Sequence, residues 1–137
     1  MELDGKFQSD DGSLPPDWPA AIATDLVVKG ALMSGRKFYK DKEMVTLLQE
    51  AGFQDITVKV LKMPATPWPK EKGLKQAGYF QALQSDTLFH SYGLALYTRV
   101  LGMSMEEATK ICDEARDSVA RARQDKIHAW NYLSVYP

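Results

Sequence analysis

Apolar side chains recur at helical spacing in three stretches of this chain. They run from about residue 19 to 34, from 41 to 51 and from 104 to 125. Apolar residues every three or four positions lie on one face of a helix. The last stretch is the clearest, because Ser104 and Glu107 have the spacing of a capping box at its start. We therefore predict three amphipathic helices.

A longer helical region is predicted between residues 70 and 101, with a rigid loop before it. Gly102 closes the region, and we expect a break near Gly78 or near Ser85. The loop, residues 63–69, reads Met-Pro-Ala-Thr-Pro-Trp-Pro. Its three prolines exclude a helix and a central strand, because proline lacks the backbone N–H and has a fixed φ angle.

Three segments show strand patterns of unequal strength. Residues 54–62 alternate in the manner of a strand, whereas 127–136 are apolar on both faces and should be covered on both sides. Residues 1–9 are a weaker candidate, followed by an irregular connection rich in Asp, Gly and Pro. Two strands alone rarely make a stable sheet, so either 1–9 or another chain must complete it.

These elements predict an α/β fragment, α+β as it stands, with about three strands and four to five helices. A length of 137 residues suits one domain, and we expect residues 1–137 to form it. Hydrophobic residues make up 45% of the chain and charged residues 26%, a composition that can support a packed core.

The charge balance gives no electrostatic case for binding nucleic acid or a membrane surface. The chain holds 17 basic and 18 acidic residues, for a net charge of −1. No apolar stretch approaches the roughly 18 residues of a membrane span, and the first residues do not resemble a signal peptide. We expect a cytoplasmic location, with the nucleus as an alternative.

Motifs for cofactors and metals are missing from the sequence. No G-x-G-x-x-G follows a predicted strand, and neither a Walker loop nor H-E-x-x-H occurs. The two histidines are far apart and lack partners at metal-ligand spacing. The single cysteine, Cys112, excludes an internal disulfide and should be a small buried helix residue. We therefore expect no cofactor-binding and no metal-binding residues.

A few side chains remain as candidates for function. His90 lies among aromatic residues, where it could line a pocket and act near neutral pH; the alternative is a packed helix residue. Trp68, held between prolines, could form a contact surface or could wedge its loop onto the long helix. His128 and the acidic pairs Asp10–Asp11 and Glu106–Glu107 are expected to have structural roles.

Several stretches, taken in order, resemble the C-terminal half of the fungal LaeA-like (TAM-domain) methyltransferases, which are class I enzymes that use S-adenosylmethionine (SAM). The stretches are 9–17 (SDDGSLPPD), 48–56 (LQEAGFQDI), 67–70 (PWPK) with Gly78 following, 94–102 (LALYTRVLG) and 126–130 (KIHAW). The resemblance implies that 1–9, 54–62 and 126–136 are strands five, six and seven. Strand seven would then run antiparallel between the other two, and 66–102 would be an insertion capping the substrate pocket.

The resemblance also exposes a departure. The family holds SAM with a glycine-rich loop and an acidic residue that precede the matched region, and this chain has neither. It therefore implies a methyltransferase reduced to its substrate side, with SAM bound only if a partner supplies the other half. That partner could be a second copy of the chain or a methyltransferase-like protein. By position, Trp68, His90 and Tyr92 are candidates for binding a small-molecule substrate of fungal secondary metabolism.

Two alternatives stay open at this point. The fold could carry a cofactor-independent cyclase or isomerase, with His90 as its acid–base residue. It could also be a non-catalytic partner subunit that pairs with another chain through an exposed sheet edge.

Overall fold

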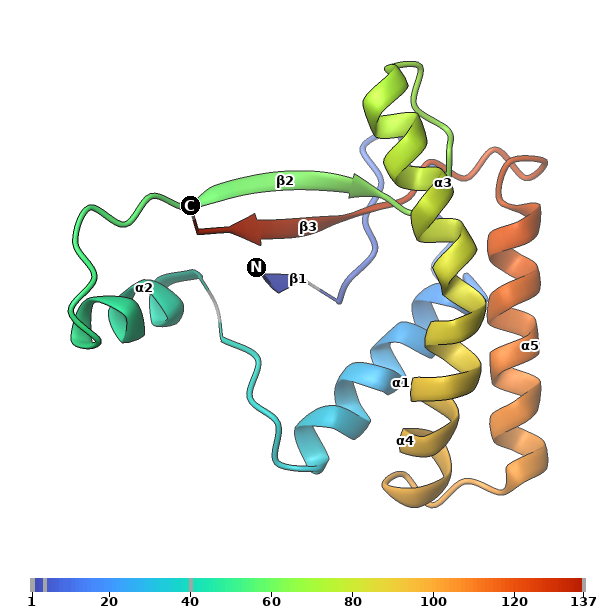
Figure 1. The fold of residues 1–137 in the computed structure, drawn as a ribbon. Coiled ribbons are helices and arrows are strands. Elements are labelled where there is room, and N and C mark those ends of the chain that lie inside the picture. Colours follow the sequence, from blue (N-terminus) through green and yellow to red (C-terminus); the bar gives the residue numbers. More distant parts are fainter. Residues whose placement is uncertain (1, 4, 40, 137) are drawn as a thin grey trace.

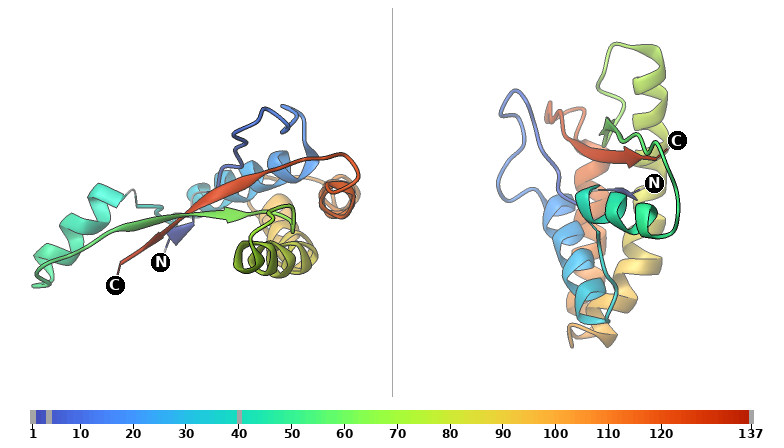
Figure 2. Two further views of the ribbon diagram at one scale, coloured as in Figure 1. Left: turned by 90° about the horizontal axis from the view of Figure 1, so that it is seen from above. Right: turned by 90° about the vertical axis from the view of Figure 1, so that its left-hand side faces the viewer.

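The computed structural model describes residues 2–3, 5–39 and 41–136. The elements within them are β1 (Glu2–Leu3), α1 (Pro19–Met33), α2 (Asp41–Glu50), β2 (Lys59–Pro64), α3 (Lys72–Thr87), the π-helical segment η1 (Leu88–Gly93), α4 (Leu94–Arg99), α5 (Met105–Arg121) and β3 (Trp130–Val135). The strands form one layer beside a group made of α1, α3, α4 and α5 (Figure 1). The α2 helix lies at the opposite end of the strands, away from the other helices (Figures 1 and 2).

The sheet has the strand order β1-β3-β2, and β3 pairs antiparallel with both neighbours. Glu2 is opposite Ser134 in one pair, and Pro64 is opposite Trp130 in the other. A bridge between Gln8 and Trp130 continues the first pairing. Of the two alternatives left open for the third strand, the N-terminal segment is the one observed. The antiparallel position of the last strand between the other two, which the resemblance implied, is confirmed.

Strand boundaries differ from those predicted. β2 begins at Lys59 rather than residue 54, because Gly52 and Asp55 both adopt positive φ angles and extend the turn after α2. The alternation in residues 54–58 therefore does not correspond to a strand. At its other end β2 includes Pro64, which was assigned to the loop. A proline is tolerated there because β2 lies at the edge of the sheet.

The helix ends follow the local signals closely. Ser104 Oγ accepts a hydrogen bond from the Glu107 N–H at 3.1 Å, and Glu107 Oε2 accepts one from the Ser104 N–H at 3.0 Å, so the predicted capping box is confirmed. The predicted break at Gly78 or Ser85 is wrong. Helical structure continues to Arg99, and it widens to π-helical pairing only over η1.

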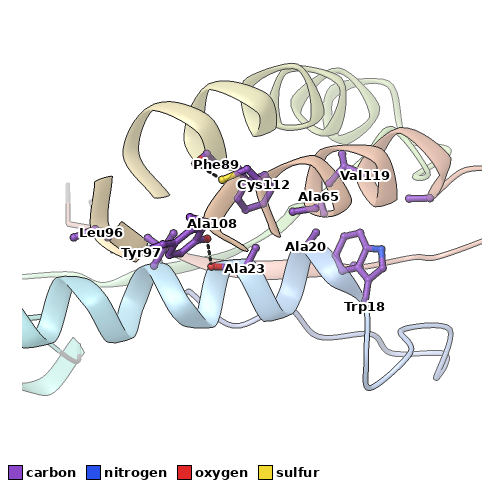
Figure 3. Packing of buried hydrophobic residues seen from close by; sticks show 14 of the residues in the cluster. Trp18, Ala20, Ala23, Ala65, Phe89, Leu96, Tyr97, Ala108, Cys112 and Val119 are labelled. Carbon is purple, nitrogen blue, oxygen red and sulfur yellow. Dashed lines mark hydrogen bonds between the residues drawn. The ribbon is translucent and has the colours of Figure 1, made fainter. Parts of the chain in front are cut away.

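The core lies between α1 and α5, and small residues allow the two helices to approach closely. Ala20 and Ala23 of α1 and Ala108 of α5 are fully buried (Figure 3). Ala115 of α5 is also fully buried. Tyr97 of α4 fills the space beside them and donates a hydrogen bond from its hydroxyl to the Ala23 carbonyl at 2.6 Å. These contacts pack α1, α4 and α5 together as one unit.

Cys112 is buried in this core, as predicted. Its thiol donates a hydrogen bond to the Phe89 carbonyl at 3.1 Å. Burial, together with the nearby negative charges of Asp113 and Asp86, raises the pKa of this thiol. Because the thiolate is the reactive form, this cysteine is a structural residue.

A close backbone contact joins α3 to the loop after β2. A Cβ atom at Gly78 would lie 2.2 Å from the Thr66 carbonyl oxygen. Only glycine allows this approach without displacing the backbone, which explains why a residue with poor helix propensity lies in the middle of α3. The contact fixes the loop that carries Trp68 against the helix.

We predict that Gly78→Ala lowers the free energy of unfolding by about 1–3 kcal/mol, because the added methyl group must push Thr66 away. Gly73→Ala in the same helix is the matched control, since the nearest atoms there belong to the flexible Glu71 side chain. Urea unfolding followed by circular dichroism measures both. Equal stability of the two variants would contradict the proposed contact.

Candidate functional site

A cavity of about 760 Å³ lies between the loop after β2, the first turns of α3 and the segment that follows α5. Its size is within the range of pockets that hold small organic ligands. Aromatic rings from three parts of the chain line it, namely Trp68, Tyr79, Phe80 and His128. Figure 1 shows that the start of α3 and the end of α5 lie at the same end of the molecule.

Trp68 is held in place by the two residues that precede β3. Its indole N–H donates to the Ala129 carbonyl at 3.0 Å, and its ring packs on the His128 imidazole with centroids 5.1 Å apart. The flanking Pro67 and Pro69 restrict the backbone on both sides. Trp68 therefore packs its own loop and also presents a pre-positioned ring to the cavity.

His128 is anchored by the segment 9–13, which is far away in the sequence. Its Nδ1 lies 2.6 Å from Asp11 Oδ2, and its backbone N–H donates to Ser13 Oγ at 2.8 Å. Asp11 Oδ1 in turn accepts hydrogen bonds from Ser9 Oγ at 2.6 Å and from the Ser13 N–H at 3.0 Å. These contacts fix both the position and the orientation of the imidazole ring.

The Asp11 carboxyl group is ionised at neutral pH. Hydrogen bonds from Ser13, Ser9 and His128 hold its pKa well below the usual range. An ionised carboxylate can only accept a hydrogen bond, so Nδ1 of His128 must carry the proton in this pair. In the neutral imidazole Nε2 is then a proton acceptor. A pair of this kind is suited to general-base chemistry, and His128 is one of the residues that line the cavity.

The local sequence patterns predicted structural roles for Asp11 and His128 and gave no sign that the two residues pair. Asp11 and His128 are separated by 117 positions, and no local spacing connects them. They meet because Gln8 pairs with Trp130 and places the following turn beside the start of β3. The strand pattern at both chain ends was the only available signal. The structural role of Asp11 in its turn was predicted, and its hydrogen bonds to Ser13 agree with that role.

The rim of the cavity is strongly basic. Lys72 and Lys75 come from α3, and Arg123 and Lys126 from the segment after α5. No Asp or Glu is among the lining residues, and none of these four cations forms an ion pair with the part of the chain that the structure describes. With four cations and no carboxylate among its lining residues, the cavity is locally positive, although the chain has a net charge of −1. Such a region attracts anions.

His90 and Tyr92, the other two predicted site residues, do not line this cavity. Both belong to η1, and His90 lies between two carboxylates, with Nδ1 2.7 Å from Asp86 Oδ1 and Nε2 3.0 Å from Asp113 Oδ1. The Tyr92 hydroxyl accepts a hydrogen bond from Arg36. The structure thus brings neither residue to Trp68, and their substrate-binding roles stay predictions.

Neither a membrane-spanning helix nor a metal-binding cluster is found among the residues that the structure describes. None of their helices is both long enough and apolar enough to cross a bilayer. No group of three or more His, Cys, Asp or Glu side chains is placed to hold a metal ion.

Comparison with known proteins gives a consistent set of relatives. The methyltransferase pytC of Aspergillus terreus is 32% identical over 121 residues, which cover 88% of this chain and 36% of pytC. The probable methyltransferase tdiE of Emericella nidulans is 25% identical over 137 residues, or 99% of the chain and 42% of tdiE. The chain is a relative of fungal methyltransferases.

A third relative is the protein-methionine methyltransferase laeA of Emericella nidulans, at 26% identity over 142 residues, covering 99% of the chain and 36% of laeA. These matches support the LaeA-like relationship that the motifs predicted. The chain spans less than half the length of each of these relatives. No protein-family model and no solved structure matches it significantly.

We predict that Ser9→Ala and His128→Gln both raise the pKa of Asp11, because the Ser9 hydroxyl and the His128 ring donate hydrogen bonds that stabilise the carboxylate. The control is His90→Gln, whose ring contacts other carboxylates. The measurement is the pH titration of the Asp11 carboxyl ¹³C shift. Because the folded-state pKa is depressed, the stabilisation is present above the ordinary carboxyl pKa of about 4 and is lost as pH falls toward the lower folded value. An unchanged Asp11 titration in both variants would contradict the network.

Proposed function

We propose that this chain forms the acceptor-substrate side of a LaeA-like class I methyltransferase of fungal secondary metabolism. In this proposal, residues outside these 137 hold SAM. The observation that carries it is the cavity beside Trp68 and His128, in a chain whose relatives are methyltransferases. Residues 66–102, which comprise α3, η1 and α4 with their flanking turns, would cap the bound substrate.

The cavity does not fit SAM, so we assign it no cofactor role. SAM has a net positive charge at neutral pH, because its sulfonium and ammonium groups outweigh its single carboxylate. The four cations at the rim would repel it. The loop between β1 and α1 also lacks the glycine-rich sequence that cradles a cofactor after a strand.

The sheet offers a place for a cofactor-bearing portion. Within the described residues β1 pairs only with β3, so its other edge presents unpaired backbone groups. Phe53, and Val60 and Leu61 of β2, are also exposed and apolar, so they offer further surface that a cofactor-bearing portion could cover. In the resembling family, the remaining strands continue the sheet beside strand five, which corresponds to β1. The proposed cofactor portion would pair here, from the same polypeptide or from a partner chain.

In this proposal, different residues of the cavity orient the acceptor substrate and remove its proton. Trp68 stacks on the substrate and fixes its plane. His128 removes the proton from the group to be methylated, and Asp11 keeps the imidazole oriented and its Nδ1 protonated. A deprotonated acceptor is the stronger nucleophile, and placing it in a fixed position lowers the entropic cost of the reaction.

A calorimetric titration tests the absence of a cofactor site in these residues. We expect no SAM binding with a Kd below about 1 mM, a level that corresponds to roughly 4 kcal/mol of binding free energy. A sub-millimolar Kd for SAM with this chain alone would contradict the proposal.

A chimera tests the catalytic role. This chain replaces the segment of the Aspergillus terreus pytC methyltransferase that it matches, and methyl transfer is measured with that enzyme's own acceptor. We expect His128→Gln to lower kcat by about 10²- to 10⁴-fold, the usual contribution of a general base. His90→Gln is the matched control and should keep kcat. The reverse pattern would favour His90 and overturn the assignment of His128.

The same pair of residues favours one alternative function. An Asp–His pair in a cation-lined cavity can move protons without any cofactor, as a cyclase or isomerase requires. Omitting SAM from the assay separates the two functions. Turnover that persists without SAM would support the alternative.

A further inference from the structure

We infer that the cavity is selective for a planar aromatic acid, a ring system that bears a carboxylate or another anionic group. The inference rests on the proposed function only in treating this ligand as the acceptor substrate. The binding preference itself follows from the side chains that line the cavity.

The aromatic side chains favour a flat ring. Trp68 and His128 pack on one another with their planes inclined by 32°, and Trp68 is fixed by its bond to Ala129. Tyr79 and Phe80 of α3 lie edge-to-face, 5.8 Å apart, and are 56% and 50% exposed. Two aromatic pairs in one cavity, neither fully covered by protein, can contact a ring by stacking or edge-to-face packing.

The four cations at the rim favour a negative group on that ring, while the carboxylate of Asp11 is engaged by Ser9, Ser13 and His128. Lys72 and Lys75 are one helical turn apart on α3, whereas Arg123 and Lys126 come from the segment that follows α5. An anion between α3 and that segment would contact cations from both. The planar guanidinium of Arg123 can bind a carboxylate through two parallel hydrogen bonds. A neutral ring would leave every one of these cations without a counter-charge.

Other anions fit the cavity less well. A nucleic acid phosphate backbone needs a basic stripe along a surface, but Lys72, Lys75, Arg123 and Lys126 surround one cavity in a chain of slightly negative net charge. The carboxylates of an acidic peptide would pair with the cations, but they would leave the aromatic side chains of the cavity without a ring to contact. The combination of aromatic side chains and cations therefore favours one small molecule that carries both a flat ring and an anionic group.

The experiment compares matched probes on the whole chain. 2-Naphthoate, 2-naphthamide and cyclohexanecarboxylate are titrated by calorimetry, with the quenching of tryptophan fluorescence as a second readout. We expect 2-naphthoate to bind at least about tenfold more tightly than either of the other two probes, because each lacks one of the two features. The advantage over 2-naphthamide should shrink as salt is added, since exposed charges are screened.

Exposed cations are suitable for substitution because their removal leaves the core intact. We expect Arg123→Gln and Lys75→Gln each to weaken 2-naphthoate binding by several-fold to tenfold and to leave 2-naphthamide unchanged. Lys110→Gln is the control, since Lys110 lies on α5 outside the cavity and faces Glu114. Equal affinity for 2-naphthoate and 2-naphthamide, or wild-type affinity in Arg123→Gln, would overturn the inference.

These outcomes are independent of the proposed function. If the chain binds 2-naphthoate selectively and also binds SAM with a sub-millimolar Kd, the proposal that SAM is held outside these residues is wrong. The inferred ligand class is still supported. A chimera that methylates neutral acceptors, with no preference for the acid in binding, would remove the ligand class and leave the methyltransferase role.

Discussion

The backbone of residues 128–130 connects segments from opposite ends of the chain, and the candidate site depends on that connection. On one side, Gln8 and Trp130 exchange backbone hydrogen bonds of 2.8 and 2.9 Å. On the other, Ala129 accepts hydrogen bonds from the Ala65 N–H and from the Trp68 indole. A strand placed between two others can make such contacts with both. The short segment thereby brings Asp11 and Trp68 to His128.

The packing of the helices also helps to hold the residues of the candidate site in place. Alanines on α1 and α5 allow close contact, and the buried Tyr97 hydroxyl ties α4 to α1 through the Ala23 carbonyl. The contact of Gly78 with Thr66 then holds α3 against the end of β2. Each wall of the cavity is therefore attached either to β3 or to the helical core. Rigid attachment of this kind is what allows a site to bind without first being reorganised.

Local signals predicted much of the fold and little of the site. Ser104 and Glu107 marked the start of α5 correctly, because a cap depends on residues a few positions apart. The start of β2 was wrong, because a strand also needs a partner and the turn conformation of Asp55 was not visible in the alternation. Trp68 was singled out from its prolines alone. The Asp11–His128 pair was missed, since it exists only through pairing between distant strands.

The protected state of Cys112 has a practical consequence for experiments in solution. As the single cysteine of the chain, it is buried, hydrogen-bonded to the Phe89 carbonyl and hard to deprotonate. A maleimide or nitroxide reagent should therefore leave it unmodified while the protein is folded. A second cysteine introduced on an exposed surface such as α2 could then be labelled alone. Distances between α2 and the helical group could be measured without first removing a native thiol from the core.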